Sequence, residues 1–430
     1  MSLRIIRSAG RACVALALAM NASAITACNS LLDVDNPGSV PEESLSDPAL
    51  APAVVAAALQ TLQCGVENFA ATGGMLSGEY LSANGFVNNH IWEWRGVIEI
   101  ENAPGSCNNG RNTTSMGFYT PLQQARFQLE DAFNRLDQFT DEQVEDRAES
   151  MAELRAYAGY AYLLLGEGMC EMAIDGGPKM TKEEVIAIAI DRFSDAITRA
   201  TAANDQSILN MARVGRARAQ LDLNKLTEAA ADAILVPAGF VRNAEFAEGG
   251  EAARENRIYN LTIRNDFLSV GEPYRNLMVN GVTGSVPDPR VKTKDTGKNG
   301  SDGATRVWQQ QKFVAQAGGS PIPIASWNEA QLIYAEAVKG QEGFDAINRV
   351  RTANGVPVLS GPAPTGQAFT DLILEERRRQ LFSEGQRYVD MLRYQLPFPT
   401  GVNRKGQTFS DLTCVPLPLV ETLNNPNFKS

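Results

Sequence analysis

Apolar residues recur at steps of three or four through the middle of the chain. Leu122, Ala125, Leu129, Phe133 and Leu136 form one such stripe, which predicts an amphipathic helix beginning at about Phe118. Thr181 followed by Glu183 and Glu184 has the composition of a helix N-terminus. By the same criteria, further helices are predicted over about 144–166, from Thr181 through Ala196, and over 207–222 and 225–236.

Small residues stand where these predicted helices would cross. Ala158-Gly159-x-x-Tyr162 is similar to the first helix of a tetratricopeptide unit, and Ala212-x-x-Gly215 with Pro237 is similar to a second. Paired helices approach closely only where side chains are small. The expected fold is therefore mainly α, with a tetratricopeptide-like helical repeat body. Ordinary antiparallel helices are the alternative, because neither unit begins with tryptophan.

Two long stretches lack a helical period. Residues 64–117 and 238–325 are rich in glycine and asparagine or proline, and long inserts of this kind are usually functional. A helix near 48–63 precedes the first insert, and helices at about 327–338, 343–353 and 367–393 follow the second. We expect a single domain over residues 48–430.

The N-terminus has the pattern of a lipoprotein signal peptide. Arg4, Arg7 and Arg11 precede a short apolar run, which ends in Ile25-Thr26-Ala27-Cys28. Residues 1–27 are predicted to be removed as a signal peptide. Cys28 is predicted to carry lipid chains that include palmitate, and residues 28–47 are predicted to form a tether. The alternative is cleavage after Ala22-Ser23-Ala24, which would leave no lipid anchor.

Charge and cysteine content narrow the class of partner. The formal charge of −11 becomes −14 once the three signal arginines are removed, which argues against a nucleic-acid ligand. Membrane attachment would then depend on the lipid, whose buried methylenes contribute about 0.8 kcal/mol each. Four cysteines remain in an oxidising compartment, and they allow three disulfide connectivities: Cys64, Cys107, Cys170 and Cys414.

Catalysis has little support in the sequence. His90 is the single histidine, so a catalytic triad or a zinc site of the HExxH type is difficult to assemble. Phosphate-binding glycine motifs are also missing from the sequence. A pair of catalytic carboxylates cannot be located among 50 acidic residues. We expect a protein that is not an enzyme and that uses neither a metal nor a cofactor.

Four blocks in the C-terminal third resemble the SusD/RagB family of nutrient-uptake lipoproteins. Residues 327–337, WNEAQLIYAEA, are similar to the family's aE-x-x-Li-x-AEA helix, and 346–355 to its iNxvRxraG segment. Residues 373–393 are similar to i-x-x-ERrrEL-x-x-EG-x-R-x-x-DL-x-R, and 416–426 to PiP-x-x-E-x-x-x-NP. Departures occur at Trp327-Asn328, where the family often has arginine, and at 169–174.

The resemblance implies a location, a ligand and a partner. It implies a lipid-anchored protein on the surface of the outer membrane that binds a glycan or a peptide. It also implies a partner, a TonB-dependent transporter of the SusC type, to which the nutrient is delivered. The alternative is a tetratricopeptide-type scaffold for outer-membrane protein assembly, without a small-molecule ligand.

Acidic and arginine side chains alternate in the 373–393 block. Residues four apart on a helix can pair, which stabilises it by a few tenths of a kcal/mol, and buried acid–arginine networks fix the register between elements. We interpret these residues as a structural ion network: Glu375, Arg379, Glu384, Arg387 and Asp390.

Aromatic and amide residues in the inserts are candidates for ligand contact. Trp92 and Trp94 alternate, and on an extended strand both indoles would lie on one face. Aromatic faces contact the apolar side of a sugar ring, while amides and guanidinium groups bond its hydroxyls. The other candidates are Tyr80, Asn88, Asn89, Arg95, Tyr274 and Trp308. The alternative role of these aromatics is to anchor the inserts to the body.

Overall fold

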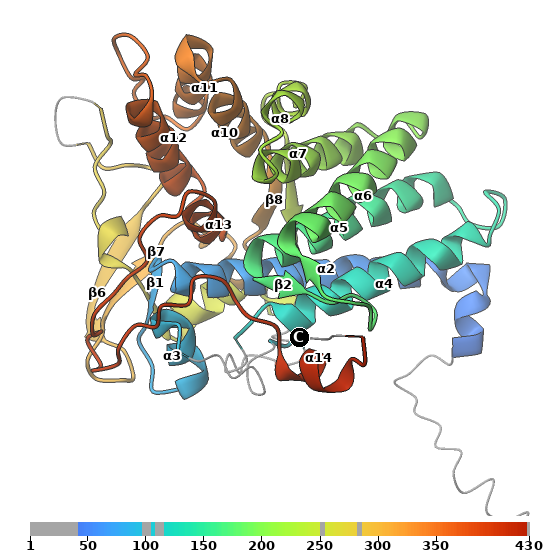
Figure 1. Ribbon diagram of the computed structural model, residues 1–430, viewed down its shortest axis with the longest axis horizontal. Coiled ribbons are helices and arrows are strands. Elements are labelled where there is room, and N and C mark those ends of the chain that lie inside the picture. Colours follow the sequence, from blue (N-terminus) through green and yellow to red (C-terminus); the bar gives the residue numbers. More distant parts are fainter. Residues whose placement is uncertain (1–41, 97–104, 108–115, 250–253, 282–285, 428–430) are drawn as a thin grey trace, which may run out of the picture. The chain divides into compact units, whose positions relative to one another are not determined.

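The computed structural model describes residues 42–96, 105–107, 116–249, 254–281 and 286–427 (Figure 1). The chain divides into two compact units, Met1–Leu50 and Ala51–Ser430. The described part of the first unit consists of two short 3-10 helices, η1 (Glu42–Ser46) and η2 (Pro48–Leu50). The predicted signal peptide, residues 1–27, and the predicted lipidation site, Cys28, lie outside the described residues.

The second unit is built on a row of helices that pack in chain order. They are α4 (Tyr119–Asp137), α5 (Arg147–Gly168), α6 (Lys182–Ala202), α7 (Gln206–Asp222) and α8 (Leu226–Ala233) (Figure 1). A capping box begins α6, because Thr181 accepts from the backbone N–H of Glu184 and the Glu184 side chain accepts from Thr181. The predicted helix boundaries hold to within three residues, except that α6 continues six residues beyond Ala196. The mainly α, tetratricopeptide-like architecture is confirmed.

Two glycines let three of these helices meet. Phe193 of α6 lies between Gly159 of α5 and Gly215 of α7. A Cβ atom at Gly159 would lie 2.6 Å from the Phe193 ring, and one at Gly215 would lie 2.3 Å from it. Such distances are far inside van der Waals contact, so the small residues noted in the sequence are required by the packing of Phe193.

The helix predicted near 48–63 is longer than predicted, because α2 spans Ala51–Leu76. Gly65, Gly73 and Gly74 lower its helix propensity, but packing compensates, since a Cβ atom at Gly65 would lie 2.7 Å from Leu122 of α4. The stretch Pro48–Leu76 is long and apolar enough to cross a membrane by length and composition. Residues Cys64–Leu76 are nevertheless all buried, as in a core helix.

The C-terminal helices are α10 (Trp327–Val338), α11 (Gly340–Ala353), α12 (Gln367–Gln380) and α13 (Gln386–Arg393). The single helix predicted over 367–393 is thus wrong, because the chain breaks after Gln380. Ser383 and Gly385 adopt positive φ angles of 65° and 79° at the break, and the Gly385 Cβ position is 3.0 Å from the Ala70 Cα of α2. Gly385 therefore permits both the turn and the close packing on α2.

The inserts contain short elements tied together in pairs. Antiparallel pairing joins β1 (Tyr80–Ser82) to β5 (Leu268–Val270), β4 (Val241–Ala244) to β8 (Ile322–Ser326), and β6 (Thr293–Asn299) to β7 (Arg306–Gln310). In addition, β2 (Glu171–Met172) pairs with β3 (Met180–Thr181). The helix α3 spans Val87–Trp94, and α14 spans Leu419–Asn424. Strand pairing across the two inserts brings residues 80–96 and 268–310 together.

Two disulfides resolve the connectivity that the sequence left open. They join Cys64 to Cys107 and Cys170 to Cys414. The second bond closes a separation of 244 residues and holds the segment after α13 against the end of α5.

Candidate functional site

A cleft of about 470 Å³ opens where both inserts meet the C-terminal segment. Its volume lies in the range of small-molecule sites. We call it the Tyr274 cleft. Its lining comes from the end of α2, β1, α3, η5 (Glu272–Tyr274), α12, α13 and the segment after α13: Ser77, Gly78, Leu81, Glu93, Glu272, Pro273, Tyr274, Arg378, Arg387, Met391, Pro397, Phe398, Pro399 and Phe409.

Close backbone approach places the two inserts beside each other at the cleft. The N–H of Gly271 donates to the carbonyl of Glu79 at 2.8 Å, directly beside the β1–β5 pair. A Cβ atom at Gly271 would lie 2.1 Å from the Gly78 carbonyl oxygen, so only glycine fits there. The two inserts, which are far apart in the sequence, are thereby joined at one defined contact.

Tyr274 is 3% exposed and its ring is fixed on both sides. It stacks on Phe382 with ring centres 5.2 Å apart, and the Arg378 guanidinium lies 4.8 Å from its centre. Its hydroxyl is buried, and although the Arg378 side chain lies close to the hydroxyl oxygen, the O–H has no acceptor among the described residues. Burial raises the pKa of that hydroxyl, so it is a neutral donor at physiological pH.

Arg387 lines the cleft from the first turn of α13. Within the described ranges it forms neither an ion pair nor a side-chain hydrogen bond. Its charge acts on the nearby Glu79, whose carboxylate accepts from the N–H of Ser383 at 3.0 Å through one oxygen. Burial raises the pKa of Glu79 to about 7, against the opposing effects of the Ser383 hydrogen bond and of Lys312 and Arg387.

Arg95 fixes the opposite wall. It has a positive φ of 50° after α3, and its guanidinium donates to the carbonyls of Leu412, Pro399 and Ser410 at 2.8, 2.6 and 2.8 Å. It also lies over the rings of Phe398 and Phe409, at 5.2 and 5.4 Å. Two of the three guanidinium nitrogens of Arg95 are thus bonded to protein carbonyls, Nη1 has no partner among the described residues, and the group packs on the two aromatic rings that line the cleft.

The other predicted ligand residues are dispersed. The strand expected at Trp92 and Trp94 is wrong, because α3 is helical there and places the indoles about 200° apart. Trp92 is buried near Phe118, and Trp94 is partly buried.

The remaining candidates also lie outside the cleft lining. Tyr80 is buried and bonds Ser383 through its hydroxyl. Asn88 is exposed, whereas Asn89 is buried. On β7, Trp308 is partly exposed under Arg275. The structure therefore brings only Tyr274, of the eight candidates, into the cleft, with Arg95 behind its wall.

The acid–arginine residues of the C-terminal block divide into two groups. Glu375 pairs with Arg379 at 2.6 Å, Asp390 pairs with Arg377 at 2.9 Å, and Glu384 pairs with Lys312 at 2.6 Å. The expected bridging role of Arg387 is not seen, since this residue faces the cleft instead. Equally short and more deeply buried contacts involve a residue that the sequence did not single out, Glu376, which pairs with Arg351 and Arg290.

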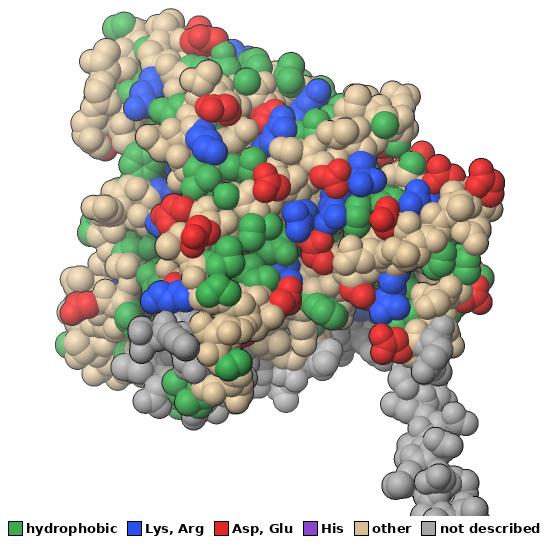
Figure 2. All heavy atoms as spheres, turned by 45° about the vertical axis from the view of Figure 1, so that its right-hand side comes forward, with side chains coloured by type: hydrophobic (Ala, Val, Ile, Leu, Met, Phe, Trp, Pro, Cys, Tyr) green, Lys and Arg blue, Asp and Glu red, His purple; other side chains and the backbone are tan. Residues whose placement is uncertain are grey.

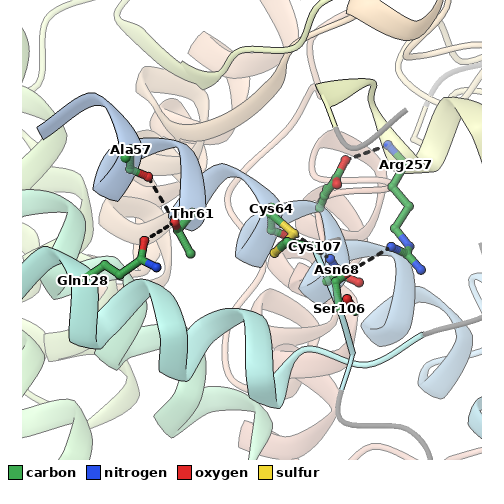
Figure 3. The surroundings of a disulfide bond; sticks show 9 residues. Ala57, Thr61, Cys64, Asn68, Ser106, Cys107, Gln128 and Arg257 are labelled. Carbon is green, nitrogen blue, oxygen red and sulfur yellow. Dashed lines mark hydrogen bonds between the residues drawn. A yellow bond between two sulfur atoms is a disulfide. The ribbon is translucent and has the colours of Figure 1, made fainter. Parts of the chain in front are cut away.

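A second cavity, of about 490 Å³, lies beside the Cys64–Cys107 disulfide (Figure 3). Figure 3 shows polar groups in and beside this cavity bonded to one another: the single proton of the Thr61 hydroxyl is shared between the Ala57 carbonyl and the Gln128 side-chain oxygen, and Asn68, next to the cavity, donates to the carbonyl of Cys64. Glu67, also in its lining, accepts from the N–H of Arg257 at 2.7 Å, and burial raises its pKa to about 8. These contacts tie α2 to neighbouring segments, so we interpret this cavity as a structural junction.

On the face drawn in Figure 2, acidic and basic side chains are interspersed with hydrophobic ones. Among the described residues, no group of three or more histidine, cysteine or acidic side chains could hold a metal ion.

Sequence reasoning missed the C-terminal wall of the cleft. Phe398 lies between Pro397 and Pro399 just after the last family-like helix, and an aromatic residue held between prolines was the available signal. Nothing in the sequence indicated that Arg387 would be unpaired, because its spacing from Glu384 and Asp390 is that of side chains that pair on a helix.

Comparison with known proteins agrees with this architecture. Residues 252–414 match the model of the SusD family. No curated protein shows significant sequence similarity to the chain.

Several solved structures have the same fold. A SusD-like carbohydrate binding protein from Bacteroides vulgatus is 16% identical, with a TM-score of 0.65 over 89% of this chain and 97% of that one. A SusD homolog from Bacteroides thetaiotaomicron is 16% identical, with a TM-score of 0.63 over 91% and 98%. A laminarin binding SusD-like protein is 14% identical, with a TM-score of 0.56 over 89% and 98%. Residues 252–414 are therefore similar to the SusD family, and most of the chain shares the fold of solved SusD-like proteins.

Proposed function

We propose that this protein is a glycan-binding subunit of a nutrient-uptake complex and that the Tyr274 cleft is its ligand site. The observation that carries the proposal is the pairing state of the cleft. The Tyr274 O–H has no acceptor and the Arg387 guanidinium has no partner among the described residues, while aromatic rings line the same space. Sugar hydroxyls would satisfy the two donors, and the apolar face of a sugar ring would pack on Phe398 or Phe409.

Two relatives support the ligand class. One solved structure of this fold is described as a carbohydrate binding protein and another as laminarin binding. A peptide remains the competing ligand, because a guanidinium group also binds carboxylates.

The affinity of the cleft can be measured by isothermal titration calorimetry. The titrations would use residues 28–430 with Cys28→Ser and laminarihexaose, maltohexaose and an acidic hexapeptide. We expect at least one hexasaccharide to bind, and Arg387→Gln and Tyr274→Phe each to weaken that binding about tenfold, which corresponds to about 1.4 kcal/mol. Arg306→Gln is the matched control, because Arg306 is half-exposed on the β6–β7 pair and is paired with Asp295. Binding of the peptide alone would contradict the glycan assignment.

We further propose that Cys28 is lipidated at the outer-membrane surface and that the protein delivers its ligand to a SusC-like TonB-dependent transporter. Radiolabelled palmitate should label the wild type but not Cys28→Ser. Affinity purification of the lipidated protein from detergent-solubilised outer membranes should recover a TonB-dependent β-barrel in stoichiometric amount. Recovery of assembly factors without a barrel would favour the scaffold alternative.

A further inference from the structure

A second groove lies on the other side of α12 from the Tyr274 cleft. It has two parts, of about 420 and 260 Å³, which share Lys312 and Gln380 in their linings. Arg378 lines the Tyr274 cleft, whereas Gln380 lines the groove. Residues two apart on a helix point about 200° away from each other, so α12 separates the two spaces. We call this the Trp327 groove.

One wall of the Trp327 groove is aromatic and apolar. Trp327 begins α10, and its N–H donates to the carbonyl of Phe240 at 2.8 Å. The β4–β8 pair holds both residues in place, because Val241 stands opposite Ser326 in its register. Trp327 and Phe240 are partly exposed and Val241 is 49% exposed. A stretch of apolar surface containing an indole is therefore available on a rigid support.

The other wall is a row of amides contributed by three helices. Asn354, after α11, donates to the side-chain oxygen of Asn328 at 3.1 Å, and Gln380 donates to the side-chain oxygen of Asn354 at 3.3 Å. Gln380 is only 9% exposed, and its own side-chain oxygen has no partner among the described residues. A buried acceptor left without a donor costs about 1–3 kcal/mol, and a ligand hydroxyl in the groove would remove that cost.

The positive charge of Lys312, which lines both parts of the groove, is already neutralised by Glu384. The Lys312 ammonium donates to the carbonyls of Gln380 and Phe382 and to Glu384, at 3.1, 2.8 and 2.6 Å. All three of its donors are thus used. Lys312 is therefore not available to a ligand, although Lys292 also lines the smaller part of the groove, whereas a hydroxyl-rich ligand would find an aromatic face and amides.

We propose that the Trp327 groove is a second saccharide-binding site. The ligand class rests on the proposed glycan-binding function, but the location is independent of the Tyr274 cleft. Two sites separated by one helix would hold one long glycan at two places or two glycans at once, which raises its effective affinity without new contacts at either site.

The test uses a variant with a disabled cleft, Arg387→Gln with Tyr274→Phe, titrated calorimetrically with maltohexaose and laminarihexaose. We expect residual binding that Trp327→Ala weakens a further tenfold or more. Val241→Arg should block the groove in the same way, and because Val241 is half-exposed this change should leave the fold intact. Trp327→Phe should retain most of the binding, which separates loss of the aromatic face from loss of structure.

The outcomes separate the two proposals. If the wild type binds a hexasaccharide but the cleft-disabled variant does not, the Trp327 groove is not a saccharide site and the proposed function stands. If Trp327→Ala and Val241→Arg abolish binding while the cleft variants bind normally, the groove is the site and the cleft assignment is overturned. If neither sugar binds the wild type, both proposals are overturned.

Discussion

Two neighbouring regions on α12 and α13 differ in whether their charged side chains are paired. The first, here called the buried ion network, comprises Asp288, Arg290, Glu336, Arg351, Glu376, Arg377, Asp390 and Arg393. In it Glu376 accepts from Arg351 and Arg290, each at 2.6 Å, and from Asn280 at 2.9 Å. The second is the Tyr274 cleft, where Arg387 and the Tyr274 hydroxyl have no such partners among the described residues.

The difference indicates which region supports the fold and which is available to a ligand. A buried charge is tolerated when opposite charges and hydrogen bonds surround it, and it then fixes the register of the elements that carry it. A donor that is left unpaired in a cleft gains a partner only when something binds. Sequence spacing cannot make this distinction, because Arg387 and Asp390 belong to the same family-like block.

The largest expected effect is that of Glu376→Gln on stability. This change removes one negative charge from between two buried arginines without altering the side-chain volume. Losing one partner of a buried ion pair costs about 3–5 kcal/mol, which urea denaturation would measure. Glu375→Gln is the matched control one residue away, because Glu375 is partly exposed and its loss should cost about 1 kcal/mol or less. Equal costs for the two variants would contradict the division into regions.

Glu79→Gln tests the electrostatics behind the cleft. The pKa of Glu79 is about 7 in the folded protein, above its ordinary value of 4.5. The folded state therefore binds the proton more tightly, and the resulting stability is present below pH 4.5 and lost as the pH rises through 7. Relative to the wild type, Glu79→Gln should gain up to about 3 kcal/mol between pH 4.5 and pH 8. Glu272→Gln, at a side chain that is 85% exposed, should show no such trend in the same urea titrations. A difference between Glu79→Gln and the wild type that does not change with pH would refute the prediction.

The sequence predicted the helical body far better than the cleft. Periodic apolar residues such as Leu122 and Leu129 report local structure, and α4 begins and ends close to where they indicate. The contacts of the cleft are non-local, because they join Gly78 to Gly271 and Arg95 to Pro399. Trp92 and Trp94 were misplaced because two alternating aromatics fit a strand, while burial of Trp92 against Phe118 accompanies a helix.

Gly215→Ala gives the cost of disturbing the close packing of α7 on Phe193 of α6. Alanine is favoured over glycine in helices by about 1 kcal/mol, but its Cβ atom would lie 2.3 Å from the Phe193 ring. Overpacking should dominate and destabilise the protein by about 1–3 kcal/mol. Adding Phe193→Leu should recover part of this loss in a double-mutant cycle. A Gly215→Ala variant as stable as the wild type would show that α6 and α7 can separate freely.

The smallest expected effect on stability is that of Arg387→Gln, and it bears most directly on the comparison. Because Arg387 has no ion pair within the described ranges, its replacement should change the free energy of unfolding by about 0.5 kcal/mol or less. Asp390→Asn, three residues further along α13, breaks the buried pairs with Arg377 and Arg393 and should cost about 3 kcal/mol or more. The two variants should rank the other way in their effect on ligand binding. Arg387→Gln should weaken saccharide binding about tenfold, while Asp390→Asn, once folded, should leave it unchanged. If Arg387→Gln unfolds the protein as readily as Asp390→Asn, then Arg387 supports the fold like its neighbours, and the cleft loses the residue that most distinguishes it from the network.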